Sequence, residues 1–326
     1  MRKRLGVGIL VSVLCSAATL GLGLSTRAEA GQYANVVVVA KSGGDFSDPI
    51  SAINSISDAT ASKPYLIKIM PGIYDIQDSS ISLKNYIDIE GSGVNTTKII
   101  GNGSIIYGLY GENTVSELRD FTIESRGIAS NMTVVGGAPN KMTNIDINAK
   151  STTNLLRTQF IGISTPWVGG STTPTILTNV KVNMDANNIS KCVGIWLANG
   201  RSDIFIKNSN FTCSNILGNG AAMSQDAWGY SLKITNSDFN ASGENAIGMT
   251  VSDNNINNSY PPMTMLNSSV SGTSAAIKAN TYQHYNNTGE LDIINSKIVG
   301  SIQNSSFISF KCLNNYNQNL EPVACP

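Results

Sequence analysis

Two tryptophans and three polar residues near them are the side chains whose types best suit the binding of a ligand. Trp196 and Trp228 lie 32 residues apart, which is close to the length of an internal repeat described below. Aromatic faces beside hydrogen-bonding groups are well suited to holding a sugar ring. The sequence therefore predicts a carbohydrate-binding surface formed by Trp196, Arg201, Gln225, Asp226 and Trp228. The alternative is that both tryptophans fill the core or seal a loop against it.

Residues that could catalyse a reaction do not form a recognisable set. Hydrolysis of a glycoside needs two carboxyl groups that flank the scissile bond, whereas Asp185 and Asp253 are single acids in asparagine-rich segments typical of turns. Lys191 and Arg201 could abstract a proton in an elimination, but no cluster of acids accompanies them. The single histidine, His284, lies in a polar segment that suits a surface loop. We therefore predict no catalytic residue, no metal ion and no cofactor.

A short phrase repeats along the chain and must position these side chains. Its pattern is an apolar residue, any residue, Asn, two residues of any kind and an apolar residue, as in the segment IKNSNF that begins at Ile206. Steps of 24 to 35 residues separate the anchor positions, which are Asp120, Asn144, Asn179, Asn208, Asn236, Asn267 and Asn295. Such self-similarity indicates a solenoid, a propeller or an array. The repeats are short and β-branched, so an all-β fold that winds as a parallel β-helix suits them better than a propeller or a sandwich.

The repeated asparagine has a mechanical role in such a solenoid. Two strands of one coil meet at a tight bend, where one residue must adopt a left-handed conformation that Asn tolerates better than other non-glycine residues. Stacked coils would place these amides above one another, so that they can hydrogen-bond along the stack. The apolar pairs that flank the asparagines should point inward and stack in layers; they are Ile206 with Phe211, Ile234 with Phe239, Met265 with Val270, and Ile293 with Ile298.

The beginning of the chain is typical of an export signal. Residues 1–30 start with MRKR, continue as an apolar run and end in Ala28-Glu29-Ala30, which resembles a signal peptidase site. We therefore expect a protein secreted to the extracellular space or the periplasm, without a membrane-spanning helix. The formal net charge is zero, which argues against a nucleic-acid partner. The expected organisation is a signal peptide at 1–30, an N-terminal strand and capping helix at 31–62, the β-helix at 63–305 and a C-terminal tail at 306–326.

Four cysteines follow the signal segment, and an exported chain with an even number of cysteines suggests disulfides. Cys192 and Cys213 are 21 residues apart, close to one coil, and Cys312 and Cys325 bracket a short tail. Three pairings are possible, and we favour 192–213 with 312–325. A metal site is the alternative.

The N-terminal part resembles a known family. The segments VVVVAKSGGDFSDPISAINSI, KPYLIKIMPGIYDI and NYIDIEGSGVNTTKIIG, within 35–101, are similar to the opening of pectin methylesterases and of the wider pectin-lyase-like superfamily. The resemblance implies a right-handed parallel β-helix with an N-terminal capping helix, for which Asp48 can be the N-cap and Pro49 the first helical residue.

The catalytic motifs of pectin methylesterases are largely missing. The family uses a Gln-Asp-Thr segment, a second Asp about one coil later, and an Arg followed closely by Trp. The nearest match is SQDAWG at 224–229, the segment around Gly248 contains no carboxylate, and no arginine follows Arg201. We therefore expect a non-catalytic protein that binds polysaccharide or cell-surface glycan. The alternatives are a carbohydrate-active enzyme of the pectinesterase or polysaccharide-lyase type, and a structural or adhesive surface protein; an oligomer is possible in each case.

Overall fold

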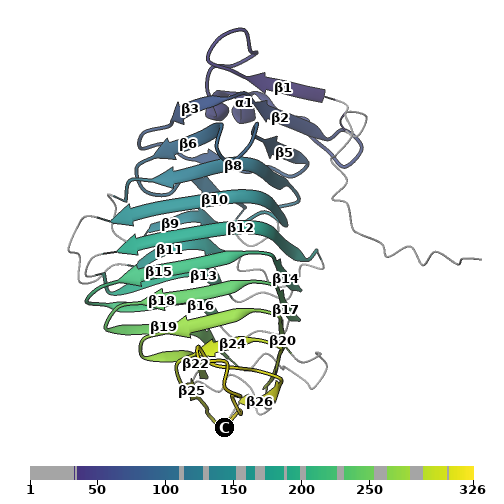
Figure 1. The fold of residues 1–326 in the computed structure, drawn as a ribbon. Coiled ribbons are helices and arrows are strands. Elements are labelled where there is room, and N and C mark those ends of the chain that lie inside the picture. The colour runs from purple at the N-terminus through teal and green to yellow at the C-terminus, as the bar shows by residue number, and fades with distance from the viewer. Residues whose placement is uncertain are drawn as a thin grey trace, which may run out of the picture. The chain divides into compact units, whose positions relative to one another are not determined.

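Short runs of alternating apolar and polar residues form strands whose apolar side chains all point to one side, since side chains alternate along a strand. The computed structural model describes residues 33, 35–109, 114–127, 132–151, 159–165, 173–186, 189–198, 203–225, 231–252, 263–279, 289–306 and 308–326. In this part of the chain, 26 strands wind into a parallel β-solenoid with three faces (Figure 1). The predicted all-β fold is thereby confirmed.

The first two faces form one sheet of 17 strands in the described residues. The first face contains β1 (Asn35–Val39), β2 (Tyr65–Ile69), β5 (Ile87–Glu90), β14 (Ile204–Lys207), β17 (Leu232–Thr235), β20 (Met263–Leu266), β23 (Gly289–Ile294) and β26 (Ile308–Leu313). The second face contains β3 (Gly72–Asp75), β6 (Thr97–Gly101), β15 (Asn210–Asn215), β18 (Asp238–Ser242), β21 (Ser269–Gly272) and β24 (Lys297–Val299). Three long strands run through both faces: β8 (Glu117–Ser125), β10 (Lys141–Ser151) and β12 (Thr175–Ala186).

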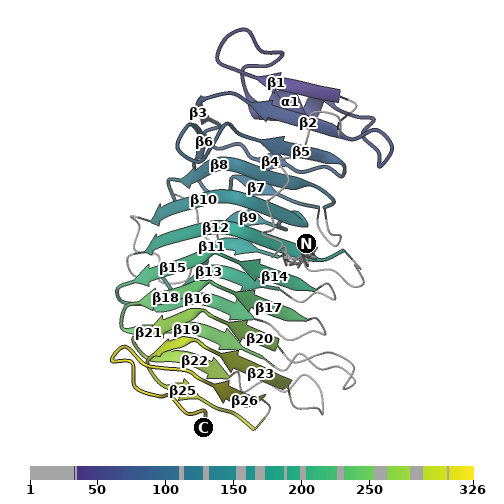
Figure 2. The same cartoon turned by 45° about the vertical axis from the view of Figure 1, so that its right-hand side comes forward.

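The third face is a separate sheet of nine strands within the described ranges. Its strands are β4 (Ile81–Ser82), β7 (Ile106–Tyr107), β9 (Met132–Gly136), β11 (Gln159–Ser164), β13 (Lys191–Leu197), β16 (Asn219–Gln225), β19 (Asn245–Val251), β22 (Ala275–Ala279) and β25 (Ile302–Gln303). Figure 2 shows β16, β19 and β22 following one another along the stack. All pairings between these strands are parallel. Because neighbouring strands are hydrogen-bonded to each other, each lies about 4.8 Å from the next.

The corners between the first and second faces are formed by the repeated asparagines. All seven predicted positions have φ between 49° and 62°, which is the left-handed region. Their amides also stack: Nδ2 of Asn144 donates to Asp120 Oδ1 (2.9 Å), Nδ2 of Asn179 to Asn144 Oδ1 (2.7 Å), and Nδ2 of Asn236 to Asn208 Oδ1 (3.3 Å). Both the corner conformation and these amide contacts agree with the prediction from the repeat.

A second ladder, which the sequence analysis missed, runs beside the asparagines. The serine after each of the last four of these corners is buried, and the backbone N–H of one donates to the hydroxyl of the next, from Ser209 to Ser237 to Ser268 to Ser296 (3.1–3.2 Å). The series ends at Asn315, whose Oδ1 accepts from the N–H of Ser296 (2.9 Å). Because a buried N–H without an acceptor is costly, each serine supplies a bond that the bent backbone cannot make.

We expect Asn236→Ala to lower the free energy of unfolding by about 1–2 kcal/mol, because alanine has a Cβ that disfavours the left-handed region. Asn236→Gly keeps the corner conformation and removes only the amide, so it should cost less. Urea unfolding of both variants measures the difference. Equal stability of the two would show that the left-handed conformation does not limit this corner.

The eight apolar residues predicted to point inward are all buried, none more than 1% exposed. They lie in register from rung to rung, so that Phe211 stacks on Phe239 with 5.2 Å between ring centroids. Helix α1 (Pro49–Ser55) has the predicted cap, since Asp48 Oδ1 accepts from the N–H of Ser51 (2.8 Å). Its Ala52 and Ile53 are fully buried and it packs against β1, β2 and β4. That α1 closes the end of the core stays a prediction.

The C-terminal segment adds to the solenoid. Strand β26 pairs with β23, so the ladder continues past 305, the expected boundary, to Leu313. Beyond it, Asn314 repeats the left-handed corner with φ 54°, and Ile298 N–H donates to the carbonyl of Tyr316 (2.8 Å). The disulfide Cys312–Cys325 ties the end of the chain to β26. Among the residues that the structure describes, no helix is long and apolar enough to cross a bilayer.

Candidate functional site

A groove of about 650 Å³ lies on the outer side of the third face. Strands β13, β16, β19 and β22 supply most of the side chains, with one residue from β11. Its lining in the described part of the chain is Gln159, Ser190, Lys191, Cys192, Asn219, Gly220, Ala221, Ser224, Asn245, Ile247, Thr250 and Lys278. The volume is within the range of small-molecule sites, roughly 300–1,000 Å³.

Strand register arranges the outer side chains of this face in three columns. The first column is polar and contains Gln159, Lys191, Asn219 and Asn245. The middle column is apolar and contains Ile161, Val193, Ala221, Ile247 and Ala275. The third column contains Ser164, Trp196, Ser224, Thr250, Lys278 and Gln303. Of the middle column only Ala221 and Ile247 line the groove, because Ile161, Val193 and Ala275 are buried. A short apolar strip therefore lies between two hydrogen-bonding columns.

Lys191 and Trp196 meet across β13. The Nζ atom of Lys191 lies 5.3 Å from the centre of the Trp196 ring, which is a cation–π distance. Trp196 pairs in register with Ser224, whose Oγ accepts a hydrogen bond from Thr250 Oγ1 (3.1 Å). Since Lys191 lines the groove, its contact places the indole at the groove margin. Trp196 is half-buried, which leaves part of its ring accessible.

The structure separates the five predicted binding residues. Trp196 lies beside the groove, as described above. Gln225 is fully buried and pairs with the core residue Leu197, so the prediction that its side chain forms a binding surface is wrong. The cause is strand alternation, because Ser224 takes the outward position and its neighbour must point inward. Arg201, Asp226 and Trp228 lie outside the described residues.

Sequence reasoning missed the two lysines as a pair. Lys191 lies on β13 and Lys278 on β22, three rungs away, which is roughly 14 Å along the solenoid axis. No acidic residue is among the described residues that line the groove. The two lysines occupy different columns, Lys191 the first and Lys278 the third, so no single repeated position in the sequence marks them as a pair.

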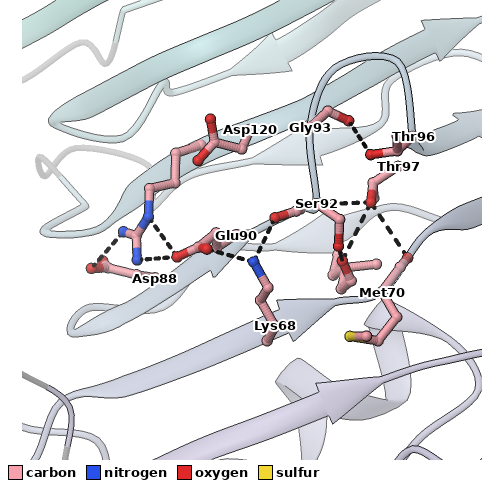
Figure 3. Close-up of polar contacts among 12 residues, drawn as sticks. Lys68, Met70, Asp88, Glu90, Ser92, Gly93, Thr96, Thr97 and Asp120 are labelled. Carbon is pink, nitrogen blue, oxygen red and sulfur yellow. Dashed lines mark hydrogen bonds and ion pairs between the residues drawn. The ribbon is translucent and has the colours of Figure 1, made fainter. Parts of the chain in front are cut away.

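A second concentration of charge lies on the first face, around Arg119. Its guanidinium donates to Glu90 Oε2 from both Nε (2.8 Å) and Nη2 (2.6 Å), and from Nη1 to Glu117 Oε2 (3.1 Å). Nη1 also lies 3.7 Å from Asp88 Oδ2. Lys68 of β2 donates to Glu90 of β5, and Figure 3 shows the Lys68 side chain pointing toward Glu90. Lys141 pairs with Glu117 (3.1 Å).

Tyr33 covers part of this cluster. Its hydroxyl donates to Asp88 Oδ2 and accepts from Arg119 Nη1 (3.1 Å), while the guanidinium lies 5.7 Å from the ring centre. Burial and the bond to Asp88 raise the pKa of Tyr33 to about 12. Burial also raises the pKa of Asp88 above its usual value, although Tyr33 and Arg119 oppose this.

Glu90 has the opposite shift. Burial opposes its ionisation, but hydrogen bonds from Lys68 and Arg119 outweigh this effect and lower the pKa. Three carboxylates therefore share three cations, namely Arg119, Lys68 and Lys141. Because the charges are engaged with one another, the cluster is better suited to fastening strands β2, β5, β8 and β10 than to binding a substrate.

The disulfide Cys192–Cys213, which the sequence spacing favoured, is present and joins the third face to the second. Cys192 is in β13 and Cys213 is in β15, with their Cα atoms 6.3 Å apart and both side chains fully buried. With Cys312–Cys325, the structure contains both favoured pairings.

Comparison with known proteins gives a family and several distant structures. A pectin methylesterase from Aspergillus niger is 12% identical, with 88% of this chain and 86% of that chain covered and a TM-score of 0.44. A mannuronan C-5 epimerase A-module from Azotobacter vinelandii is 14% identical, with coverage of 83% and 72% and a TM-score of 0.41. A pectin methylesterase from Erwinia chrysanthemi is 14% identical, with coverage of 90% and 91% and a TM-score of 0.38. No curated protein matches significantly in sequence.

The family match covers most of the solenoid. Residues 33–264 match the family described as rhamnogalacturonase A/epimerase, pectate lyase-like. This match includes the N-terminal segments that carry the resemblance to the pectin-lyase-like superfamily, and it confirms that resemblance. The chain belongs to the rhamnogalacturonase A/epimerase, pectate lyase-like family.

Proposed function

We propose that this protein binds an anionic polysaccharide along the groove of the third face. The observation that carries the proposal is the three-column surface, in which two lysines and several amides and hydroxyls flank an apolar strip. A pyranose ring has an apolar C–H face and a rim of hydroxyls, so it matches such a strip and its polar borders.

The spacing of the rungs suits a chain of sugars. Neighbouring strands repeat about every 4.8 Å, which is close to the length of one pyranose unit in an extended polysaccharide. A glycan that runs along the solenoid axis would therefore meet a similar set of groups at each rung. Asn219 and Asn245, on successive rungs, would contact equivalent hydroxyls of successive sugars.

The charge of the groove favours an acidic ligand. Lys191 and Lys278 are both partly buried, so their charges are screened less by salt than those of fully exposed lysines. They would pair with carboxylate or sulfate groups about three sugar units apart. An anion there would meet no nearby acid among the described lining residues.

Such a ligand would be met outside the cytoplasm. The predicted signal peptide at 1–30 and the two disulfides support export to an oxidising compartment, extracellular or periplasmic. In this proposal the strand and helix of 31–62 begin the fold, 63–305 carries the groove, and 306–326 finishes the last rung.

Binding to a polysaccharide panel tests the proposal. We expect carboxylated or sulfated glycans to bind and neutral glycans of similar linkage to bind weakly, with an affinity that falls as salt rises. The proposal would be contradicted if the protein bound charged and neutral glycans with equal affinity, or if it bound no glycan. An absence of any glycan binding would favour the alternative of a structural or adhesive surface protein.

Trp196→Ala is expected to weaken binding of the anionic glycan about tenfold, because the indole offers an apolar face at the groove margin. Trp196→Phe keeps an aromatic face and should recover most of the affinity. Calorimetric titration of the two variants measures the effect. Unchanged binding by Trp196→Ala would remove the indole from the site.

An enzyme that acts on the same glycan is the second candidate, and the family match favours it. Asp226 directly follows β16, whose outer side chains line the groove. Release of unsaturated products, reducing ends or methanol from an anionic glycan would reveal activity. Loss of that activity in Asp226→Asn, with binding retained, would assign the carboxyl group to catalysis.

A further inference from the structure

The disulfide Cys192–Cys213 lies at the proposed groove, whose lining includes Cys192. Cys192 lies in β13 between Lys191, which lines the groove, and Val193, which is fully buried in the middle column. Its partner Cys213 lies in β15 on the second face. The bond therefore links the position of a groove strand to a strand of the second face.

The neighbouring rung is adapted to this bond. Gly220 of β16 pairs in register with Cys192, and a Cβ atom added to it would lie 3.3 Å from Cys213 Sγ. A separation of 3.3 Å is shorter than an ordinary van der Waals contact, so a side chain at position 220 would crowd the sulfur of Cys213, and glycine avoids this contact. Strand β13, which contains Cys192, and strand β16, which pairs with it, both carry groove side chains.

We propose that oxidation of Cys192 and Cys213 positions β13 in the groove and so switches glycan binding on. This inference rests on the proposed function of the groove. Two sulfurs that are not bonded must keep a van der Waals separation of roughly 3.5–4 Å. Because the core is close-packed, that separation moves β13 relative to β15 instead of being absorbed by empty space.

A movement of β13 would displace the outward-facing side chains of one rung and leave those of the other rungs in place. Lys191 and Val193 move with Cys192, whereas Asn219, Ala221 and Ser224 remain on β16. A ligand that contacts several rungs would lose its alignment with the first of them. The reduced chain should therefore keep its solenoid and bind polysaccharide weakly.

The switch fits the path of an exported protein. In the cytoplasm both thiols stay reduced, and in an oxidising compartment they exchange with a small-molecule disulfide. In that exchange the two thiols give up two electrons and two protons, one Sγ–Sγ bond forms, and the disulfide reagent leaves as two thiols. Binding would thus begin after export.

The test compares four forms of the protein: oxidised, reduced after production in a reducing cytoplasm, Cys192→Ala/Cys213→Ala, and Cys312→Ala/Cys325→Ala. The last is a matched control, since it removes the other disulfide, which lies away from the groove. We expect the reduced form and the first variant to raise the Kd for the anionic glycan at least tenfold. The control should bind within about twofold of the oxidised protein.

Hydrogen exchange supplies a readout that does not need the glycan. Amides of β13 should exchange faster in the reduced form and in Cys192→Ala/Cys213→Ala, and at the oxidised rate in the control variant. The inference would be overturned if the oxidised and the reduced protein were both folded, bound the glycan with equal affinity and showed equal exchange in β13. It would also be overturned if the reduced protein and Cys192→Ala/Cys213→Ala both lost the far-UV circular dichroism signal of β structure. If the oxidised protein binds no glycan at all, the proposed function fails and the switch with it.

Discussion

Replacing Arg119 by alanine is expected to lower the free energy of unfolding by about 3–5 kcal/mol at neutral pH. The Arg119 side chain is only 9% exposed, and it is the cation that Glu90, Glu117 and Asp88 share. Without it, three largely buried carboxylates on adjacent strands would lose their main partner and repel one another. Chemical unfolding of the variant and the parent protein measures the loss.

The cost of Arg119→Ala should depend on pH. In the parent protein the pKa of Glu90 is lowered, so its contribution to stability is present above its unfolded value and is lost as the pH falls through the folded value. In the variant the carboxyl pKa values rise, because the nearby positive charge is gone. Protonation then removes the repulsion, and the difference in stability between variant and parent should shrink as the pH falls toward 4.

Arg126→Ala is the matched control for this prediction. Arg126 also pairs with an acid, Asp75, but both side chains are about one-third exposed. An exposed pair of this kind contributes about 0–1 kcal/mol. Similar losses for the two arginine variants, or a loss for Arg119→Ala that does not change with pH, would contradict the assignment of Arg119 to a buried ionic network.

The fold could be predicted because each corner leaves a local mark in the sequence. Asn is one of the few residues that enter the left-handed region without a large cost, so the bend appears in the sequence as Asn at six positions and as Asp at one. The alternation of apolar residues around it then fixes which side chains point inward. The serine ladder was missed although serine follows Asn208, Asn236, Asn267 and Asn295, because serine alone is too common to indicate a buried hydrogen bond.

The candidate site was harder to predict, because it is formed across rungs. Lys191 and Lys278, three rungs apart, border one groove only because of the register of β13, β16, β19 and β22. The sequence does not state this register, since the loops between strands vary in length. Adjacent residues of a strand also point to opposite sides of the sheet, so Ser224 lines the groove whereas its neighbour Gln225 is buried. Trp196 was singled out because its spacing to Trp228 is close to one repeat, and its role in binding stays a prediction.

Reversal of both groove charges, in Lys191→Glu/Lys278→Glu, is expected to weaken binding of an anionic glycan by about 100-fold or more. Each substitution replaces an attraction with a repulsion, and like charges at a binding surface cost several kcal/mol. The stability of the protein should change little, because neither lysine makes an ion pair among the described residues. Titration with the glycan identified by the panel measures the affinity.

Lys207→Glu/Lys233→Glu is the control that separates a local site from the net charge of the protein. These lysines are exposed on the first face, in β14 and β17, and change the net charge by the same amount. If the anion is held by general attraction, the two double variants will lose affinity equally, and high salt will remove binding in both. If the groove holds it, only the first variant will lose most of its affinity, since partly buried charges act over a few ångströms and are screened least.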